Sequence, residues 1–292
     1  MTRSASNLLS LGLAAAALVG VCSAKSANAQ QDPEAIRRRF LLTIPTASSR
    51  RAGLTDLFRG APGTNTGTPL AFGPGTGDFF VGGGYQNETR GVKRANGTFA
   101  DNGNDDGSIS AGFGLGDAND GIGLTTIITS LSTFRSGFGN RTAFSFQAFR
   151  HITPTMAVAV GVENAFISGG GKTDGTDSWY GVASKVFQSP SSDMEWLKAI
   201  TVSAGIGNGR YRTVGDVSNG NKTVNVFGSV AALVHEQVSI IGDYTGQDIN
   251  VGLSIVPFKK FPISVTPALA DLTGTASKSP RLIVGVGIGM HF

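Results

Sequence analysis

Cysteine is almost absent from this chain of 292 residues, which contains only Cys22. Cys22 follows an apolar stretch, Leu8 to Val21, that Arg3 precedes and the small residues Ala27-Asn28-Ala29 follow. This order of charged, apolar and small residues is typical of a cleaved export signal and predicts one at 1–29. Loss of the signal removes the only cysteine, so disulfides, thiol nucleophiles and cysteine-bound metals are excluded from the exported chain.

Charge is also scarce, because Asp, Glu, Lys and Arg make up 15% of the residues. The formal net charge is +4, and it falls to about +2 when Arg3 and Lys25 leave with the signal. The basic clusters, such as Arg37-Arg38-Arg39, are not interleaved with an aromatic platform. This balance argues against a nucleic-acid partner.

No apolar run after the signal reaches the length of a transmembrane helix. Apolar residues instead occupy alternate positions, as in the last segment, where Leu282, Val284, Val286, Ile288, Met290 and Phe292 alternate mostly with glycine. Successive side chains of a strand point to opposite sides, so this period predicts strands with one apolar and one small or polar face. A transmembrane barrel requires that pattern, with the apolar face toward lipid.

The sequence therefore predicts an all-β fold, a transmembrane antiparallel barrel of about twelve strands that covers residues 77–292. An even number returns both ends of the barrel to the same side of the membrane. The predicted strands are 78–87, 107–117, 121–133, 141–152, 155–167, 178–188, 199–211, 223–234, 238–244, 247–256, 262–272 and 281–292.

Residues 30–76 lack this alternation, and Pro62, Pro69 and Pro74 interrupt regular structure near their end. We expect either a periplasmic lead-in or a segment that folds into the lumen and plugs it. The connections after the predicted strands alternate between long and short, as outer loops and periplasmic turns do. In this topology Tyr85, Tyr180, Tyr211 and Tyr244 lie at outer strand ends, where an interfacial aromatic girdle is expected.

The last strand ends in Gly-Met-His-Phe with Phe292 on its apolar face, and this resembles the C-terminal signal of bacterial outer-membrane proteins. The whole of 78–292 resembles small, porin-like outer-membrane barrels of an uncharacterised class. The resemblance implies the cell outer membrane of a Gram-negative-type bacterium. It also implies contact with the lipid bilayer, lipopolysaccharide and the barrel-assembly machinery, for which Phe292 would be the assembly signal.

Passive passage of ions or small solutes is the leading functional hypothesis. A barrel without an open pore is the alternative, since residues 240–258 resemble exopolysaccharide-linked outer-membrane barrels. An outer-membrane lipid hydrolase is less favoured, because it needs a histidine beside a serine nucleophile. The three histidines, His151, His235 and His291, all fall at predicted periplasmic strand ends, and none has a serine two residues on.

Four charged residues are predicted to face the lumen: Glu163, Lys185, Asp243 and Asp248. A two-residue turn at Thr245-Gly246 would set Asp243 directly opposite Asp248. Two carboxylates that close repel each other, so the pair would attract a cation at the outer mouth. These charges would tune the ion preference of a narrow path.

No cofactor and no metal centre is predicted. The run from Asp101 to Gly107 resembles a calcium loop, but Asp106 occupies the position that needs glycine and Gly112 the position that needs glutamate. We therefore expect no more than weak cation binding at the outer loops.

Overall fold

A computed structural model describes residues 61–89, 105–169, 177–188, 196–258 and 261–292. Three of the sequence predictions fall wholly or largely outside these residues: the signal at 1–29, the first part of the N-terminal segment at 30–60, and most of the cation-binding loop at 101–107. Among the described residues, no helix has both the length and the apolar character needed to cross a membrane.

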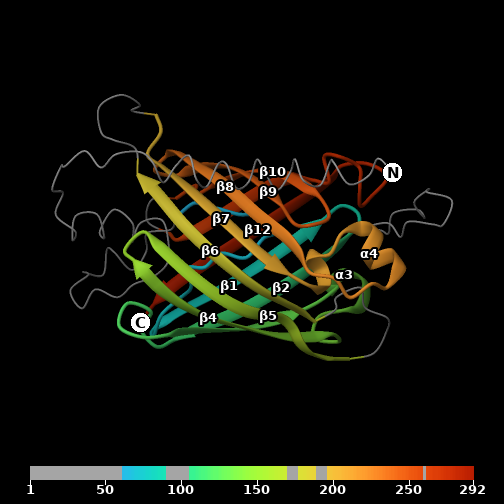
Figure 1. Cartoon of the computed structure of the whole chain (residues 1–292), viewed down its shortest axis with the longest axis horizontal. Helices are drawn as coiled ribbons and strands as arrows, with labels where there is room; N and C mark the ends of the chain where they lie inside the picture. The colour runs from blue at the N-terminus through green and yellow to red at the C-terminus, as the bar shows by residue number, and fades with distance from the viewer. Residues whose placement is uncertain (1–60, 90–104, 170–176, 189–195, 259–260) are drawn as a thin grey trace. The chain divides into compact units, whose positions relative to one another are not determined.

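Twelve antiparallel strands form one closed barrel, in which β12 pairs with β1 (Figure 1). The predicted number and order of strands are therefore confirmed. The strands are β1 (Asp78–Gln86), β2 (Asp106–Leu115), β3 (Gly123–Ser130), β4 (Thr142–Thr153), β5 (Met156–Ser168), β6 (Ser178–Gln188), β7 (Ala199–Gly207), β8 (Asn225–His235), β9 (Val238–Tyr244), β10 (Ile249–Ile255), β11 (Ile263–Ala270) and β12 (Arg281–His291). The described connections add α3 (Thr133–Ser136), the 3-10 helix η1 (Gly209–Tyr211) and α4 (Val214–Asn219).

The two ends of the barrel differ in their connections. One end, the turn end, has two-residue turns after β4 and β8, and the C-terminus lies there. The opposite end, the loop end, has the connections after β1, β3, β5, β7, β9 and β11, together with α3 and α4 (Figure 1). The alternation of loop length expected from the sequence is thus present, apart from the short connection after β9 and the longer ones after β2, β6 and β10.

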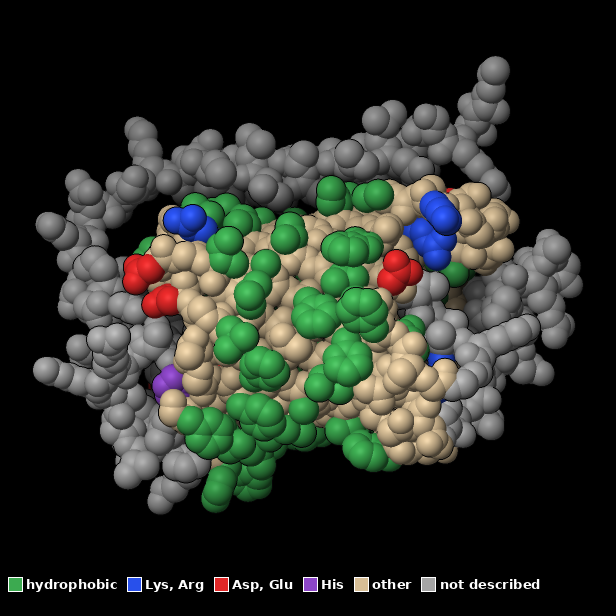
Figure 2. Space-filling model, turned by 90° about the horizontal axis from the view of Figure 1, so that it is seen from below, with side chains coloured by type: hydrophobic (Ala, Val, Ile, Leu, Met, Phe, Trp, Pro, Cys, Tyr) green, Lys and Arg blue, Asp and Glu red, His purple; other side chains and the backbone are tan. Residues whose placement is uncertain are grey.

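Alternation along the strands separates an apolar outer face from a mostly polar inner face. On β9 the side chain of Ile240 is 49% exposed, whereas Ser239 and Ile241 are buried. On β10 Val251 and Leu253 are exposed and Ser254 is buried. Figure 2 shows apolar side chains spread over the middle of one outer face, with charged side chains toward its two ends. This distribution matches the apolar band that a lipid-spanning barrel needs.

The seam between β1 and β12 closes the barrel at the turn end. His291 Nδ1 lies 2.8 Å from Asp78 Oδ1, and the Phe292 amide donates to the Gly77 carbonyl at 2.9 Å. The Phe292 side chain is 84% exposed. Closure of the seam leaves the sheet without a free edge, which is the condition for a β-structure to cross lipid.

Two of the four tyrosines do not belong to an outer girdle. Tyr85 and Tyr244 are exposed on the outer face, but Tyr211 is fully buried and Tyr180 packs with Phe227 on the inner face. The girdle prediction is therefore wrong for Tyr180 and Tyr211, because the lumen beside them is filled and accepts large rings.

The facing of the strands can be tested by placing arginine on each side of the wall. Leu253→Arg puts a charge on the outer face and should cost about 2–4 kcal/mol of unfolding free energy in vesicles. Ser264→Arg puts the same charge in the cavity described below and should cost clearly less. Urea unfolding of the barrel refolded into phospholipid vesicles measures both variants, and equal losses would contradict the assigned facing.

Candidate functional site

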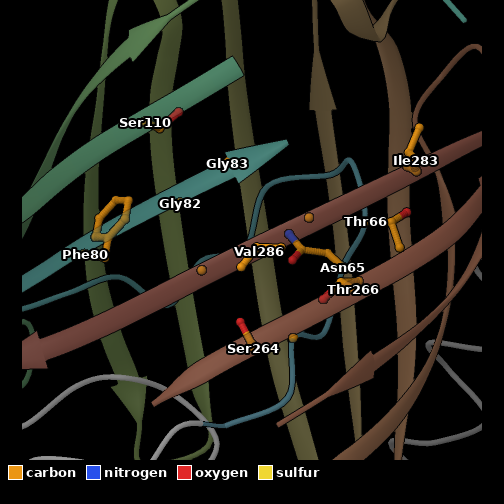
Figure 3. Close-up of a pocket in the computed structure, with 13 residues that line it drawn as sticks. Asn65, Thr66, Phe80, Gly82, Gly83, Ser110, Ser264, Thr266, Ile283 and Val286 are labelled. Carbon is orange, nitrogen blue, oxygen red and sulfur yellow. The ribbon is translucent and has the colours of Figure 1, made fainter. Parts of the chain in front are cut away.

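The described N-terminal residues 61–77 lie inside the barrel, where they form an inner loop (Figure 3). The Gly63 amide donates to Ser254 Oγ at 2.7 Å, in the half of the barrel nearer the turn end. The chain rises to the level of Asp243 near the loop end, and it then returns to the turn end before β1 begins. Of the two locations expected for the N-terminal segment, this part adopts the lumenal one.

Asp243 binds the apex of the inner loop through one carboxylate oxygen. Its Oδ2 accepts three hydrogen bonds, from the Thr66 amide at 2.9 Å, the Thr66 hydroxyl at 2.7 Å and the Gly67 amide at 2.8 Å. Asp243 is 4% exposed. A buried carboxylate needs such donors, and buried amides need an acceptor, so Oδ2 and the apex of the loop satisfy each other, whereas Oδ1 is buried without a hydrogen-bond partner among the described residues.

Arg210, which carries a positive charge, also binds the apex of the inner loop. Its Nη2 donates to the Gly67 carbonyl at 2.6 Å, and its Nη1 contacts Glu163 Oε2 at 3.0 Å. The Tyr211 hydroxyl donates to the other Glu163 oxygen at 2.9 Å. The Glu163 carboxylate raises the pKa of Arg210 above its ordinary value, so the guanidinium remains charged. Glu163 thus orients an arginine toward the loop and does not face an open pore alone.

Below the apex the inner loop packs against one half of the barrel wall. Ala71 and Phe72 are buried in a cluster with inward residues of β4 to β8, among them Phe149, Val182 and Phe227. The Ala71 amide donates to Ser184 Oγ at 2.9 Å, and Gln147 donates to the Leu70 carbonyl at 3.1 Å. This half of the lumen is therefore filled.

The other half keeps an open cavity of about 340 Å³ between the inner loop and the wall made by β1, β2, β11 and β12. Asn65 and Thr66 lie on the loop side, and Ser264 and Thr266 lie on the wall side (Figure 3). The remaining lining residues are Gly63, Phe80, Gly82, Gly83, Ser110, Ile283, Gly285, Val286 and Gly287. Glycine removes side-chain volume from the wall, and this keeps the space open.

Lys185 does not face the lumen, and its prediction is wrong. It is exposed on the outer face, where its ammonium lies 5.1 Å from the Phe187 ring centroid, while Ser184 faces the inner loop. The sequence assigned the more apolar face of β6 to lipid. On this strand the inner face is also apolar, because Val182 and Val186 pack against the filled half of the lumen.

The predicted Asp243/Asp248 pair is also wrong in its register. The turn between β9 and β10 has four residues, Thr245 to Asp248, so Asp243 lies opposite Asn250. The Thr245 amide donates to the Asp248 carbonyl at 3.0 Å and closes the turn. Both carboxylates face inward, but each has separate partners, and they do not form the repelling pair that would attract a cation.

Asp248 is paired instead with Arg281, the first residue of β12. The Arg281 Nη2 to Asp248 Oδ2 distance is 3.2 Å, and both side chains are buried. Neither Arg210 nor Arg281 was among the residues predicted to face the lumen. A signal existed for Arg281, because the alternation that places Leu282 outward places Arg281 inward. Arg210 lies in η1, where strand periodicity gives no direction.

The described residues include no cluster of three or more His, Asp or Glu side chains that could ligate a metal ion. Two histidines have structural neighbours at the turn end: His151 Nδ1 lies 3.0 Å from Asn119 Oδ1, and His291 contacts Asp78. These contacts place both histidines at the turn end, where the sequence predicted the periplasmic strand ends.

No protein-family profile and no curated protein matches the sequence. Among solved structures the chain is similar to the outer membrane protein Omp33 of Acinetobacter baumannii, with 10% identity over 74% of this chain and 98% of that one, at a TM-score of 0.40. It is also similar to an outer membrane channel of Pseudomonas putida F1, with 11% identity over 78% of this chain and 99% of that one, at a TM-score of 0.41. Both TM-scores lie below 0.5, and a likeness of this degree assigns no function.

Proposed function

We propose that this chain is a bacterial outer-membrane barrel through which ions and small solutes pass passively, along the half of the lumen that the inner loop leaves open. The observation that carries the proposal is the cavity between the loop and the glycine-rich wall. A water molecule occupies about 30 Å³, so a volume of about 340 Å³ has room for on the order of ten waters.

The cavity also extends along the barrel axis. Its lining covers Ile283 to Gly287 on β12 and Phe80 to Gly83 on β1. Four residue steps span about 13 Å along a strand, and because barrel strands are tilted this covers about 10 Å of a lipid-spanning height of about 25 Å. The closed sheet and the exposed apolar belt support the membrane location, and the short turns beside the C-terminus support a periplasmic position for that end.

A barrel without an open pore remains the second candidate, because the inner loop fills the half of the lumen lined by β4 to β8. Conductance of the purified barrel in planar phospholipid bilayers distinguishes the two. A steady ohmic conductance supports the channel, whereas bilayers that contain folded barrel and stay silent support the closed barrel.

Narrowing the cavity provides the variant test. Gly285 lines the cavity, and a Cβ added there would meet no atom closer than 3.9 Å, so Gly285→Phe can be accommodated while its ring occupies the path. We expect conductance to fall by roughly half or more, since flow scales with open cross-section.

Gly242→Phe is the matched control, because Gly242 lies on the outer face of β9, between the inward residues Ile241 and Asp243, and has no atom within 4 Å of an added Cβ. This variant should conduct as the unaltered barrel does. Equal conductance in all three proteins would place the path elsewhere.

A further inference from the structure

The cavity that forms the proposed path is lined without a single charged side chain, among the residues that the structure describes. Its polar groups are the Asn65 amide and the hydroxyls of Thr66, Ser110, Ser264 and Thr266. Hydroxyl and amide groups both donate and accept hydrogen bonds, so they can replace water around a polar solute. They provide no net field that favours one sign of charge.

The charged groups near the two ends of this path lie outside its lining, and some of them are paired. The exception at the loop end is Asp106, which is buried opposite Gln86 and accepts a hydrogen bond from the Gly107 amide, without an ion pair in the described part of the chain. At the loop end, Arg281 contacts Asp248 at 3.2 Å and donates to Gln86 Oε1 at 3.0 Å. Gln86 lies directly opposite Ile283, the lining residue nearest that end. At the turn end, Asp78 contacts His291 at 2.8 Å. In the pair of Arg281 and Asp248, the opposite charge at hydrogen-bond distance cancels most of the field that each group would exert on a passing ion.

Three inward charged residues that lie outside the cavity also have partners, either one another or the inner loop. Glu163 is paired with Arg210, and Arg210 and Asp243 bind the apex of the inner loop. None of these three residues lines the cavity. Of the four charged residues that the sequence suggested as selectivity determinants, Asp243 holds the inner loop directly and Glu163 does so through Arg210.

We infer that the path favours small uncharged polar solutes that carry hydroxyl or amide groups, and that it discriminates little between cations and anions. This inference rests on the proposed function, because it concerns the same cavity. An ion that enters a narrow path loses part of its hydration shell, and a compensating charge or ring of carbonyls must replace it. A neutral hydroxylated solute needs only hydrogen bonds, which the lining offers.

The first measurement compares solutes of similar size in proteoliposomes that contain the full barrel. The probes are L-arabinose, sodium glutamate and lysine hydrochloride, with flux followed by liposome swelling. We expect L-arabinose to enter severalfold faster than either charged probe. Reversal potentials in a potassium chloride gradient should give a potassium-to-chloride permeability ratio close to one.

Charge placed in the path should create the selectivity that the native lining lacks. Ser264→Asp should raise the potassium-to-chloride ratio severalfold and Ser264→Lys should lower it, while Ser264→Asn, which adds similar bulk without charge, should leave it near one. A native barrel that conducts with strong preference for one sign of ion, or that passes glutamate or lysine as fast as L-arabinose, overturns this inference and leaves the proposed channel intact. Absence of both swelling and conductance overturns the channel itself.

Discussion

Replacing Asp243 with alanine is expected to raise the conductance of the barrel severalfold, because it releases the apex of the inner loop. The substitution removes one oxygen that accepts three hydrogen bonds, from the Thr66 amide, the Thr66 hydroxyl and the Gly67 amide. Hydrogen bonds to a charged group contribute about 1.5–3 kcal/mol each, so no other polar contact of the loop matches this one. Without this carboxylate, three donors lose their acceptor, and we expect the apex to move to a position where water accepts their hydrogen bonds.

The effect should be graded. Asp243→Asn keeps a carbonyl acceptor without the charge, so we expect a conductance between those of the native barrel and Asp243→Ala. In single-channel recordings, the mean duration of open events should also increase from the native barrel to Asp243→Asn and then to Asp243→Ala. Arg210 still binds the Gly67 carbonyl in both variants, so complete loss of the loop from the lumen is not expected.

Ser229→Ala is the matched control, because Ser229 lies directly opposite Asp243 on β8 and is equally buried. Its hydroxyl has no hydrogen-bond partner within the described part of the chain, so its removal should not disturb the loop. If Asp243→Ala conducts like Ser229→Ala and the native barrel, the carboxylate does not restrain the loop.

The barrel itself was predictable because its determinants are local. A period of two is visible within any strand, as in Leu282 to Phe292, and turn residues separate one strand from the next. The pairing of β1 with β12 followed as well, since these are the only strands left without a second neighbour once the others pair along the chain.

The inner loop was not predictable in the same way, because its determinants are distant in sequence. Thr66 and Asp243 are 177 residues apart, and the stretch that includes Pro62, Pro69 and Pro74 has no periodicity that would reveal a partner. A segment rich in Pro, Gly and Thr fits equally well as an exposed linker or as an irregular filling of a lumen. The choice between a linker and a filling of the lumen depends on the inward side chains of the barrel that contact the segment.

The prediction that Lys185 faces the lumen was wrong for the same reason, because the sequence does not show that the inner loop fills the lumen beside β6. Assigning the apolar face of each strand to lipid assumes a polar, water-filled lumen. That assumption holds for β9 and β10, whose inner faces carry Asp243 and Ser254, and it fails for β6, whose inner face contacts Ala71. The faces of a strand can therefore be assigned from polarity only where nothing apolar fills the barrel beside it.

The buried pair of Arg281 and Asp248 should give the largest loss of stability among single substitutions in the lumen. It joins the turn after β9 to the start of β12, two strands away, and the two side chains are 4% and 0% exposed. Removing one partner leaves the other charge buried without the opposite charge of the pair, which costs about 3–5 kcal/mol. Arg281→Met should therefore lower the unfolding free energy by about that amount.

The double variant Arg281→Met/Asp248→Asn should recover most of the loss, because neither charge of this pair is then left without the other. Glu163→Gln breaks a pair whose side chains are 24% and 36% exposed, so water compensates the freed Arg210 and the cost should stay near 1 kcal/mol or less. Urea unfolding of the refolded barrels in vesicles measures all three proteins against the native one. A loss in Arg281→Met no larger than that in Glu163→Gln, or a double variant no more stable than Arg281→Met, would show that the charge of Asp248 is not confined to a dry site and that water reaches the loop end of the path.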